Sequence, residues 1–376
     1  MARFAVRLLI RLRRAAALVA MPMTAFLLAV LPRTAFAHEK WFTDPVYHPT
    51  DWALVFSGRT AVALGGGLAA VAVAGLLQRL IGDPGWPRLP FLHRMASGDV
   101  KLLAVQTAIA LIYMAVRLAL LVPQLTLAPS LLGFAVAAVE VAIAFSFITG
   151  VLDRAGAVAL LLLGLLVLVL NGPLTLLAQA HYAGIAVAVL LVGSSRQIRA
   201  PRPPFDAPEW AARGVAILRV LTGVAILSLA LGDKIWNPDL GRAFLEGYPH
   251  FNVTHALAGT GLPIALSDDV FVLAAGVIET AAGLLLLSGF LTRAVILVLL
   301  VPFNLTVPFL PAEEMIGHLP IFGILYVLLI HGAGSLRGRA LDRHGHEDAE
   351  AAQDRASHPS SSTVASAAPA SGHRSV

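Results

Sequence analysis

The sequence contains no cysteine, only three lysines, and few charged residues of either sign. Without cysteine the chain forms no disulfide, no thiolate metal site, no iron–sulfur cluster and no dithiol relay. Any redox chemistry must therefore depend on a bound cofactor or a partner protein. Charged residues make up 13% of the 376 residues, and hydrophobic residues make up 58%. A soluble domain could not bury so many apolar side chains behind a polar surface, so the chain is expected to be an integral membrane protein.

The N-terminal region, residues 1–37, predicts a secretory signal peptide. Several arginines precede an apolar stretch over residues 15–31, and the small residues "AFA" end at Ala37. A basic start, an apolar centre and a small-residue cleavage site are the three parts of such a peptide. Cleavage after Ala37 would leave His38 as the first residue of a periplasmic segment, 38–52. The alternative is an uncleaved first transmembrane helix.

Nine apolar spans follow this leader, separated by turn residues or charges. Each is about 17 to 25 residues long, the length that a helix needs to cross the hydrocarbon of a bilayer. We therefore expect an all-α membrane protein with about nine transmembrane helices. The spans lie near 53–80, 102–122, 130–150, 155–171, 174–192, 214–232, 270–290, 294–310 and 316–333.

Arginines are unevenly distributed between the loops that this arrangement creates. The connections at 123–129 and 171–173 carry no charge, whereas the loops on the other side of the membrane hold most of the arginines. By the positive-inside rule, the arginine-rich side is cytoplasmic. The mature N-terminus is then periplasmic in a bacterial inner membrane, and the tail 342–376, rich in Ala and Ser, is expected to be a disordered cytoplasmic extension. No basic surface interleaved with aromatic residues indicates nucleic acid as a partner.

The second half of the chain repeats features of the first half at one constant offset, the offset that separates Glu140 from Glu279. Because polar residues and glycines are rare in membrane helices, their coincidence at one offset indicates a duplicated helical unit. We expect two tandem four-helix units of the same orientation, 102–193 and 214–333, with a cytoplasmic linker 194–213 and an extra N-terminal helix at 53–80. The matching pairs are Glu140 with Glu279, Gly150 with Gly289, Arg154 with Arg293, Gly184 with Gly323, and Gly193 with Gly332.

Several motifs of the second unit follow one another in a characteristic order. Its first helix carries "RVLTG", with Arg219 and Gly223, and ends in "GDK" with Lys234. The next segment reads "ETAAGLLLLSGFLTR", from Glu279 to Arg293. In these motifs the second unit resembles the DoxX-like membrane proteins, and the first unit resembles them more faintly. The resemblance implies a four-helix bundle and an association with membrane redox systems, which include a subunit of a thiosulfate:quinone oxidoreductase.

Two carboxylates, Glu140 and Glu279, lie near the middle of their apolar spans. An unpaired carboxylate at that depth costs several kcal/mol, so each is expected to have a partner or to bind a ligand. Arg219 is placed either to pair with Glu279 or to extend to the cytoplasmic surface. Arg117 is the corresponding candidate partner of Glu140. The alternative is a structural role for both glutamates, as protonated groups that hydrogen-bond between helices.

Further candidate groups lie on the expected periplasmic side. Lys234 and His318 are placed near the mouth of the second unit, and the long loop 233–269 is expected to form part of a site or a partner surface. In a mature chain, the terminal amine and the imidazole of His38 would form a chelate that favours copper, with His48 close in sequence. The alternative is that the first residue of the mature chain is incidental.

Together these features predict a multi-pass inner-membrane component of a respiratory or sulfur-redox system. The second unit would bind a quinone-like molecule, with Glu279 and Arg219 at its polar end and Lys234 and His318 on the outer side. A periplasmic or membrane redox protein would be its partner. The alternative is a non-catalytic membrane scaffold or transport protein, which would handle copper through His38.

Overall fold

The structure of the chain is a computed structural model that describes residues 50–83, 86–87, 89, 99–193, 208–258, 265–306 and 312–336. Within these ranges the chain is helical, apart from connections and one isolated bridge between Ala119 and Thr126. Helices suit an apolar chain because each segment satisfies its own backbone N–H and C=O groups. The elements are η1 (Trp52–Phe56), α3 (Gly58–Ile81), α5 (Asp99–Val116), α6 (Leu131–Thr149), α7 (Asp153–Asn171), α8 (Pro173–Ala178), α9 (Ala180–Val192), α10 (Pro208–Leu229), η2 (Ala230–Ile235), α11 (Pro238–Gly247), η3 (Pro249–Phe251), α12 (Val253–Ala258), α13 (Asp268–Ser288), α14 (Thr292–Thr306) and α15 (Ala312–His331).

Six helical segments in the described ranges are long and apolar enough to cross a membrane: α3, α5, α6, α7, α10 continued by η2, and α13. Shorter apolar segments lie in α9, α14 and α15. The protein therefore has the pattern of a multi-pass helical membrane protein, with apolar helix surfaces suited to contact with lipid. Each expected span overlaps one helix or two consecutive ones. The number of crossings beyond the six long segments stays a prediction.

The span expected over 102–122 is wrong in its last part. Helix α5 ends at Val116, and the chain then folds back on itself. Leu118 and Leu121 have φ angles of 51° and 64°, which an α-helix does not contain. Residues 117–122, here called the inner loop, are therefore irregular although they are almost entirely apolar.

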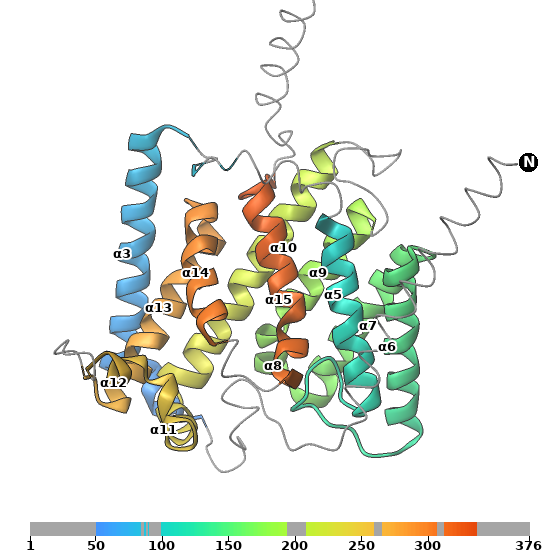
Figure 1. The fold of residues 1–376 in the computed structure, drawn as a ribbon, viewed down its shortest axis with the longest axis horizontal. Coiled ribbons are helices and arrows are strands. Elements are labelled where there is room, and N and C mark those ends of the chain that lie inside the picture. The colour runs from blue at the N-terminus through green and yellow to red at the C-terminus, as the bar shows by residue number, and fades with distance from the viewer. Residues whose placement is uncertain are drawn as a thin grey trace, which may run out of the picture.

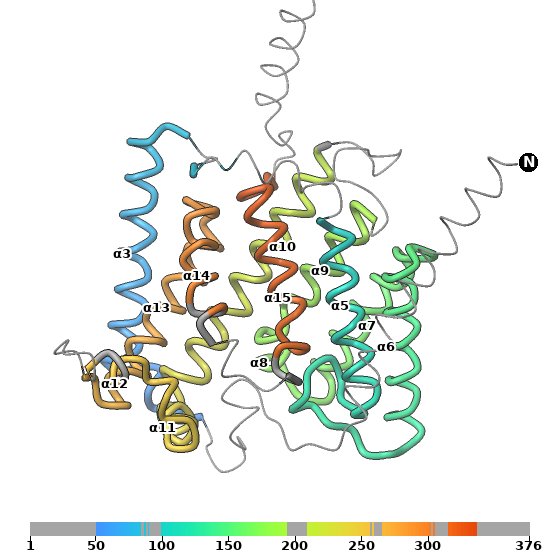
Figure 2. Tube along the Cα trace, viewed as in Figure 1, coloured from blue at the N-terminus to red at the C-terminus, as the bar shows by residue number. Residues whose placement is uncertain are grey.

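The helices form two groups that lie side by side (Figure 1). The first group comprises α5 to α9, and the second comprises α10, η2, α13, α14 and α15. Helix α3 lies at one edge of the molecule and packs along α13, whereas α6 and α7 lie at the opposite edge. Helices α11 and α12 lie at the same end of the bundle as α8, here called the α11 end (Figure 2). The α6–α7 and α13–α14 connections lie at the opposite end, here called the corner end.

The last long helix of each group packs against the first helix of the other group. Helix α9 packs on α10, and α15 packs on α5. A Cβ atom at Gly184 would lie 3.2 Å from the Cα of Leu218, and one at Gly323 would lie 2.9 Å from the Cα of Leu103. Small residues permit such close approach of membrane helices. Because these two glycines are a matching pair of the sequence repeat, the same close contact occurs twice in the fold.

The α6–α7 and α13–α14 connections, here called the corners, have the same backbone conformation. Helix α6 ends at Gly150 with φ 75°, and α13 ends at Gly289 with φ 78°. Two residues later, Leu152 and Leu291 also have positive φ angles, of 56° and 47°. Glycine adopts this conformation without the steric cost that a side chain adds, which explains its presence at both helix ends. The repeat in the sequence thus corresponds to a repeated turn in three dimensions.

Candidate functional site

An ion pair joins Lys234 and Glu279 within the second group. The Nζ of Lys234 lies 3.1 Å from the Oε2 of Glu279, and the two side chains are 14% and 36% exposed. Glu279 lies near the middle of α13, so the pair is at membrane depth if α13 crosses the bilayer. Mutual neutralisation lowers the cost of placing both charges there. The side chain of Glu279 is only partly covered by the protein.

Lys234 lies on a π-helical turn, η2, which continues α10. Such turns are rare and often mark functional sites. Gly276 makes the close approach of η2 to α13 possible, because a Cβ there would lie 2.6 Å from the Cδ1 of Ile235 and 3.1 Å from the Cβ of Lys234. The π turn and the glycine together place the ammonium group beside the carboxylate.

The expected partner of Glu279, Arg219, lies elsewhere in the structure. Its guanidinium binds backbone carbonyls at the corner end: Nε donates to the oxygen of Ala333 at 2.9 Å, and Nη1 donates to Leu286 and, at 3.0 Å, to Leu287. Arg219 and Lys234 are separated by about four turns along one helical segment, so the same carboxylate cannot reach both. The pairing with Arg219 is therefore wrong, and Lys234 takes its place.

Lys101 makes the same contact in the first group, and the sequence did not reveal it. Its Nζ donates to the carbonyl oxygens of Phe147 at 2.8 Å and Ile148 at 2.5 Å. In the sequence repeat, these two residues align with Leu286 and Leu287. A cation near the C-terminus of a helix satisfies carbonyls that have no partner within the helix and complements the helix dipole. Arg219 and Lys101 are thus equivalent groups that hold the ends of α13 and α6.

Glu140, the counterpart of Glu279, is completely buried, with 0% of its surface exposed. Its Oε1 accepts a hydrogen bond of 2.9 Å from the backbone N–H of Leu121 in the inner loop. Its Oε2 is also buried and has no hydrogen-bond partner in the described part of the chain. Arg117 does not reach it: the guanidinium lies over the ring of Tyr113, 5.7 Å from the centroid. The expected pairing of Arg117 with Glu140 is therefore wrong.

The inner loop fills the first group near the α11 end. Ala119, Leu120, Leu121 and Val122 are buried, and the hydroxyl of Tyr182 on α9 donates to the carbonyl oxygen of Leu121 at 3.0 Å. Irregular backbone is tolerated at membrane depth only where the protein encloses it and satisfies its polar groups. Glu140 and Tyr182 provide that satisfaction here.

Two residues of the second group are less buried than the residues that align with them in the first group. Val136 and Tyr182 in the first group are 4% and 2% exposed. The residues that align with them in the sequence repeat are the smaller Ala275 and Ile321, and both are only partly buried. The repeated carboxylate is thus enclosed in one group and accessible in the other.

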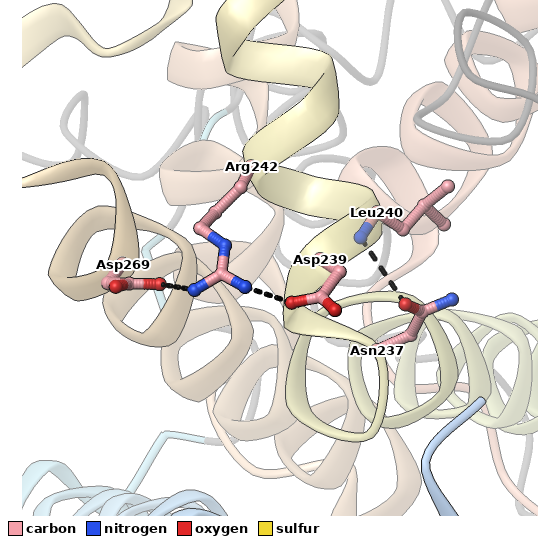
Figure 3. A network of polar contacts seen from close by, with 5 residues as sticks. All are labelled: Asn237, Asp239, Leu240, Arg242 and Asp269. Atoms are coloured by element: carbon pink, nitrogen blue, oxygen red, sulfur yellow. Dashed lines mark hydrogen bonds and ion pairs between the residues drawn. The ribbon is translucent and has the colours of Figure 1, made fainter. Parts of the chain in front are cut away.

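A set of polar contacts fixes α11 over the start of α13 (Figure 3). Arg242 on α11 donates to Asp269 on α13 at 2.7 Å and also contacts Asp239 in its own helix. The hydrogen bond with Asp269 raises the pKa of the Arg242 guanidinium above its ordinary value. The Oδ1 of Asn237 accepts from the N–H of Leu240 at 3.3 Å and caps α11. These contacts hold the segment that directly follows η2 and Lys234.

Another polar contact joins the two groups at the corner end, and the sequence analysis missed both of its members. The Nε2 of His331, the last residue of α15, contacts the Oδ2 of Asp99, the first residue of α5. The side chains are 6% and 0% exposed. Both residues lie at helix ends, next to connections that carry charges. In the sequence they therefore look like ordinary residues of the membrane–water interface. Their contact adds a polar link to the apolar packing of α15 on α5.

The remaining candidate residues are His318, His38 and His48. His318 is buried near the start of α15. His38 and His48, the candidate copper ligands, lie outside the described residues. In the ranges that the structure describes, no group of three or more His, Cys, Asp or Glu side chains could hold a metal ion.

Comparison of the chain with protein-family models, with curated proteins and with solved structures finds no match. The class of the protein therefore follows from the fold and the ion pair alone. It is a multi-pass helical membrane protein with one accessible and one enclosed carboxylate at equivalent positions.

Proposed function

We propose that this protein is a DoxX-like inner-membrane component of a respiratory or sulfur-redox system and that its second group binds a quinone-like molecule at Lys234 and Glu279. The observation that supports the proposal most is the partial exposure of this ion pair, since Glu140 at the repeated position is completely buried. A carboxylate that is only partly covered can contact a second molecule, whereas the fully buried Glu140 cannot.

The chemistry of the pair suits the head group of a quinone. The Lys234 ammonium is a donor beside Glu279, and a quinone carbonyl oxygen is the kind of acceptor that such a group binds. The Glu279 carboxylate can accept from a hydroxyl of the reduced form. Ile278, the apolar neighbour of Glu279 on α13, is 62% exposed, and apolar surface of this kind suits the ring and tail. Because the chain has no cysteine, electrons would pass between the bound molecule and a partner redox protein.

The arrangement of helices supports two further parts of the proposal. The repeated corners and the repeated glycine contacts support a tandem duplication, with α3 as the extra helix. Counting α8 with α9, and including α14 and α15, gives nine crossings. The arginine distribution then supports a cytoplasmic corner end and a periplasmic α11 end. The copper-handling alternative through His38 and His48 stays a prediction.

The proposal is tested by identifying what the full-length protein retains after purification. Lipid-soluble molecules are extracted from purified wild type, Glu279→Gln and Glu140→Gln, and are measured by mass spectrometry. We expect a quinone in wild type and Glu140→Gln, and its loss from Glu279→Gln. Absence of quinone from all samples, together with copper in stoichiometric amount, would replace the proposal with the copper-handling alternative.

A further inference from the structure

Within the first group of helices, one residue of the inner loop, Leu121, contacts two buried polar side chains. Its backbone N–H donates to the Oε1 of Glu140 at 2.9 Å, and its carbonyl oxygen accepts from the hydroxyl of Tyr182 at 3.0 Å. Its side chain is buried in the apolar core. Glu140 and Tyr182 therefore hold a compact group that combines one donor, one acceptor and a branched apolar body.

The corresponding part of the second group has no such loop among the described residues. After η2, the chain turns into α11, which packs over the start of α13 at Gly241 and Val272. The carboxylate of Glu279 remains, and Lys234 supplies a donor beside it. Ile321 stands at the position of Tyr182. The second group thus has the repeated carboxylate without the peptide group that covers it in the first.

We propose that the inner loop occupies, in the first group, the position that the ligand takes in the second group. This inference rests on the proposed function, and it narrows the class of ligand. The molecule donates a hydrogen bond to Glu279, as Leu121 does to Glu140, and accepts one from Lys234, as Leu121 does from Tyr182. The two polar groups lie close together, and a compact apolar body lies beside them. A hydroquinone meets these requirements, because one hydroxyl can both donate to Glu279 and accept from Lys234, whereas a fatty acid, which brings a second carboxylate to Glu279, does not.

It follows that the first group contains a second ligand site, which the inner loop closes. Leu121→Gly removes the side chain that anchors the inner loop in the apolar core, so the loop can leave this site, and glycine accepts the positive φ of this residue without strain. Leu118→Gly is the matched control, since Leu118 also has a positive φ but is only partly buried at the base of the loop. The probe is decylubiquinol, a reduced quinone with a short alkyl tail. Its binding stoichiometry is measured on the full-length protein in nanodiscs.

Wild type and Leu118→Gly are expected to bind one molecule of decylubiquinol, and Leu121→Gly is expected to bind two. Addition of Glu140→Ala to Leu121→Gly should return the stoichiometry to one. If wild type binds none, the proposed function fails. If wild type binds one and a folded Leu121→Gly protein also binds one, the proposed function stands and the role of the inner loop is overturned.

A second measurement keeps the inference testable if Leu121→Gly does not fold. Tyr182→Phe removes only the hydroxyl that holds the Leu121 carbonyl, and Tyr113→Phe is a buried control on α5. Modification of Glu140 by a hydrophobic carbodiimide is followed by peptide mass spectrometry. We expect modification in Tyr182→Phe alone and protection by decylubiquinol. An unmodified Glu140 in Tyr182→Phe, or modification that the probe does not reduce, would contradict the inference.

Discussion

Glu140 and Glu279 occupy equivalent positions of the sequence repeat, yet their surroundings differ in every respect that matters for chemistry. Glu140 is enclosed and accepts a hydrogen bond from the inner loop. Glu279 is partly exposed and paired with a lysine. Duplication preserves a residue type, whereas the residues around it can diverge. We therefore propose a structural role for Glu140 and a binding role for Glu279.

The role of Glu140 leads to a prediction about stability. In Glu140→Gln, the amide oxygen can still accept from the N–H of Leu121, so the free energy of unfolding should change by about 1 kcal/mol or less. Glu140→Ala leaves that N–H without a partner and creates a cavity, which should cost about 2 to 4 kcal/mol. Thermal unfolding of both variants in detergent measures the difference. Equal, small effects would show that the inner loop does not depend on Glu140.

The helix ends show which parts of the fold the sequence could predict. Apolar length identified the six long helical segments, and the glycines at 150 and 289, noted in the sequence as a matching pair, end two of these helices. The inner loop could not be predicted, because its apolar residues are those of a membrane helix and its turn depends on contacts with Glu140 and Tyr182.

The role of Lys101 could not be predicted from the sequence either. The contacts of Gly323 with Leu103 and of Gly184 with Leu218 show which positions of α5 and α10 are equivalent. By this register, Lys101 lies about one turn before the position equivalent to Arg219. The partner of Glu279 required the register between α10 and α13, which a single sequence does not provide.

The cations at the ends of α6 and α13 lead to a prediction at the level of these helices. Lys101→Met and Arg219→Met each leave backbone carbonyls without their charged donor, which should cost about 1 to 3 kcal/mol of unfolding free energy. Neither change should alter the affinity for decylubiquinol, because both cations lie at the corner end. Thermal unfolding and probe binding are compared for the two variants. Selective loss of binding in Arg219→Met would return Arg219 to the ligand site.

At the scale of the whole molecule, the two groups form an interleaved bundle in which each last helix packs on the first helix of the other group. The contact between His331 and Asp99 adds a polar link to one of these two interfaces. Helix α3 covers one face of α13, and the equivalent face of α6 remains exposed at Val141 and Phe145. The contacts between the two groups are therefore repeated, whereas in the described part of the chain the cover of α13 by α3 has no counterpart on α6.

The orientation in the membrane can be tested because the chain has no natural cysteine. Single cysteines placed between residues 245 and 260 should react in intact cells with a maleimide that does not cross the membrane. Cysteines placed between 200 and 207 should react only after the membrane is permeabilised, because the arginine-rich side is expected to be cytoplasmic. The reverse pattern would contradict both the nine-crossing arrangement and the periplasmic position of the α11 end.

The most direct measurement is the affinity for decylubiquinol of the wild type and three variants in nanodiscs. Glu279→Gln and Lys234→Met each remove a charged hydrogen-bonding group, so the dissociation constant should rise by about tenfold or more. Glu140→Gln, which changes the repeated carboxylate in the enclosed site, should leave the dissociation constant within about twofold of the wild type, well below the factor of ten that corresponds to about 1.4 kcal/mol. An equal effect at Glu140 and Glu279, or no effect at either, would show that the repeated carboxylate is structural in both groups and that Lys234 and Glu279 do not form the binding site.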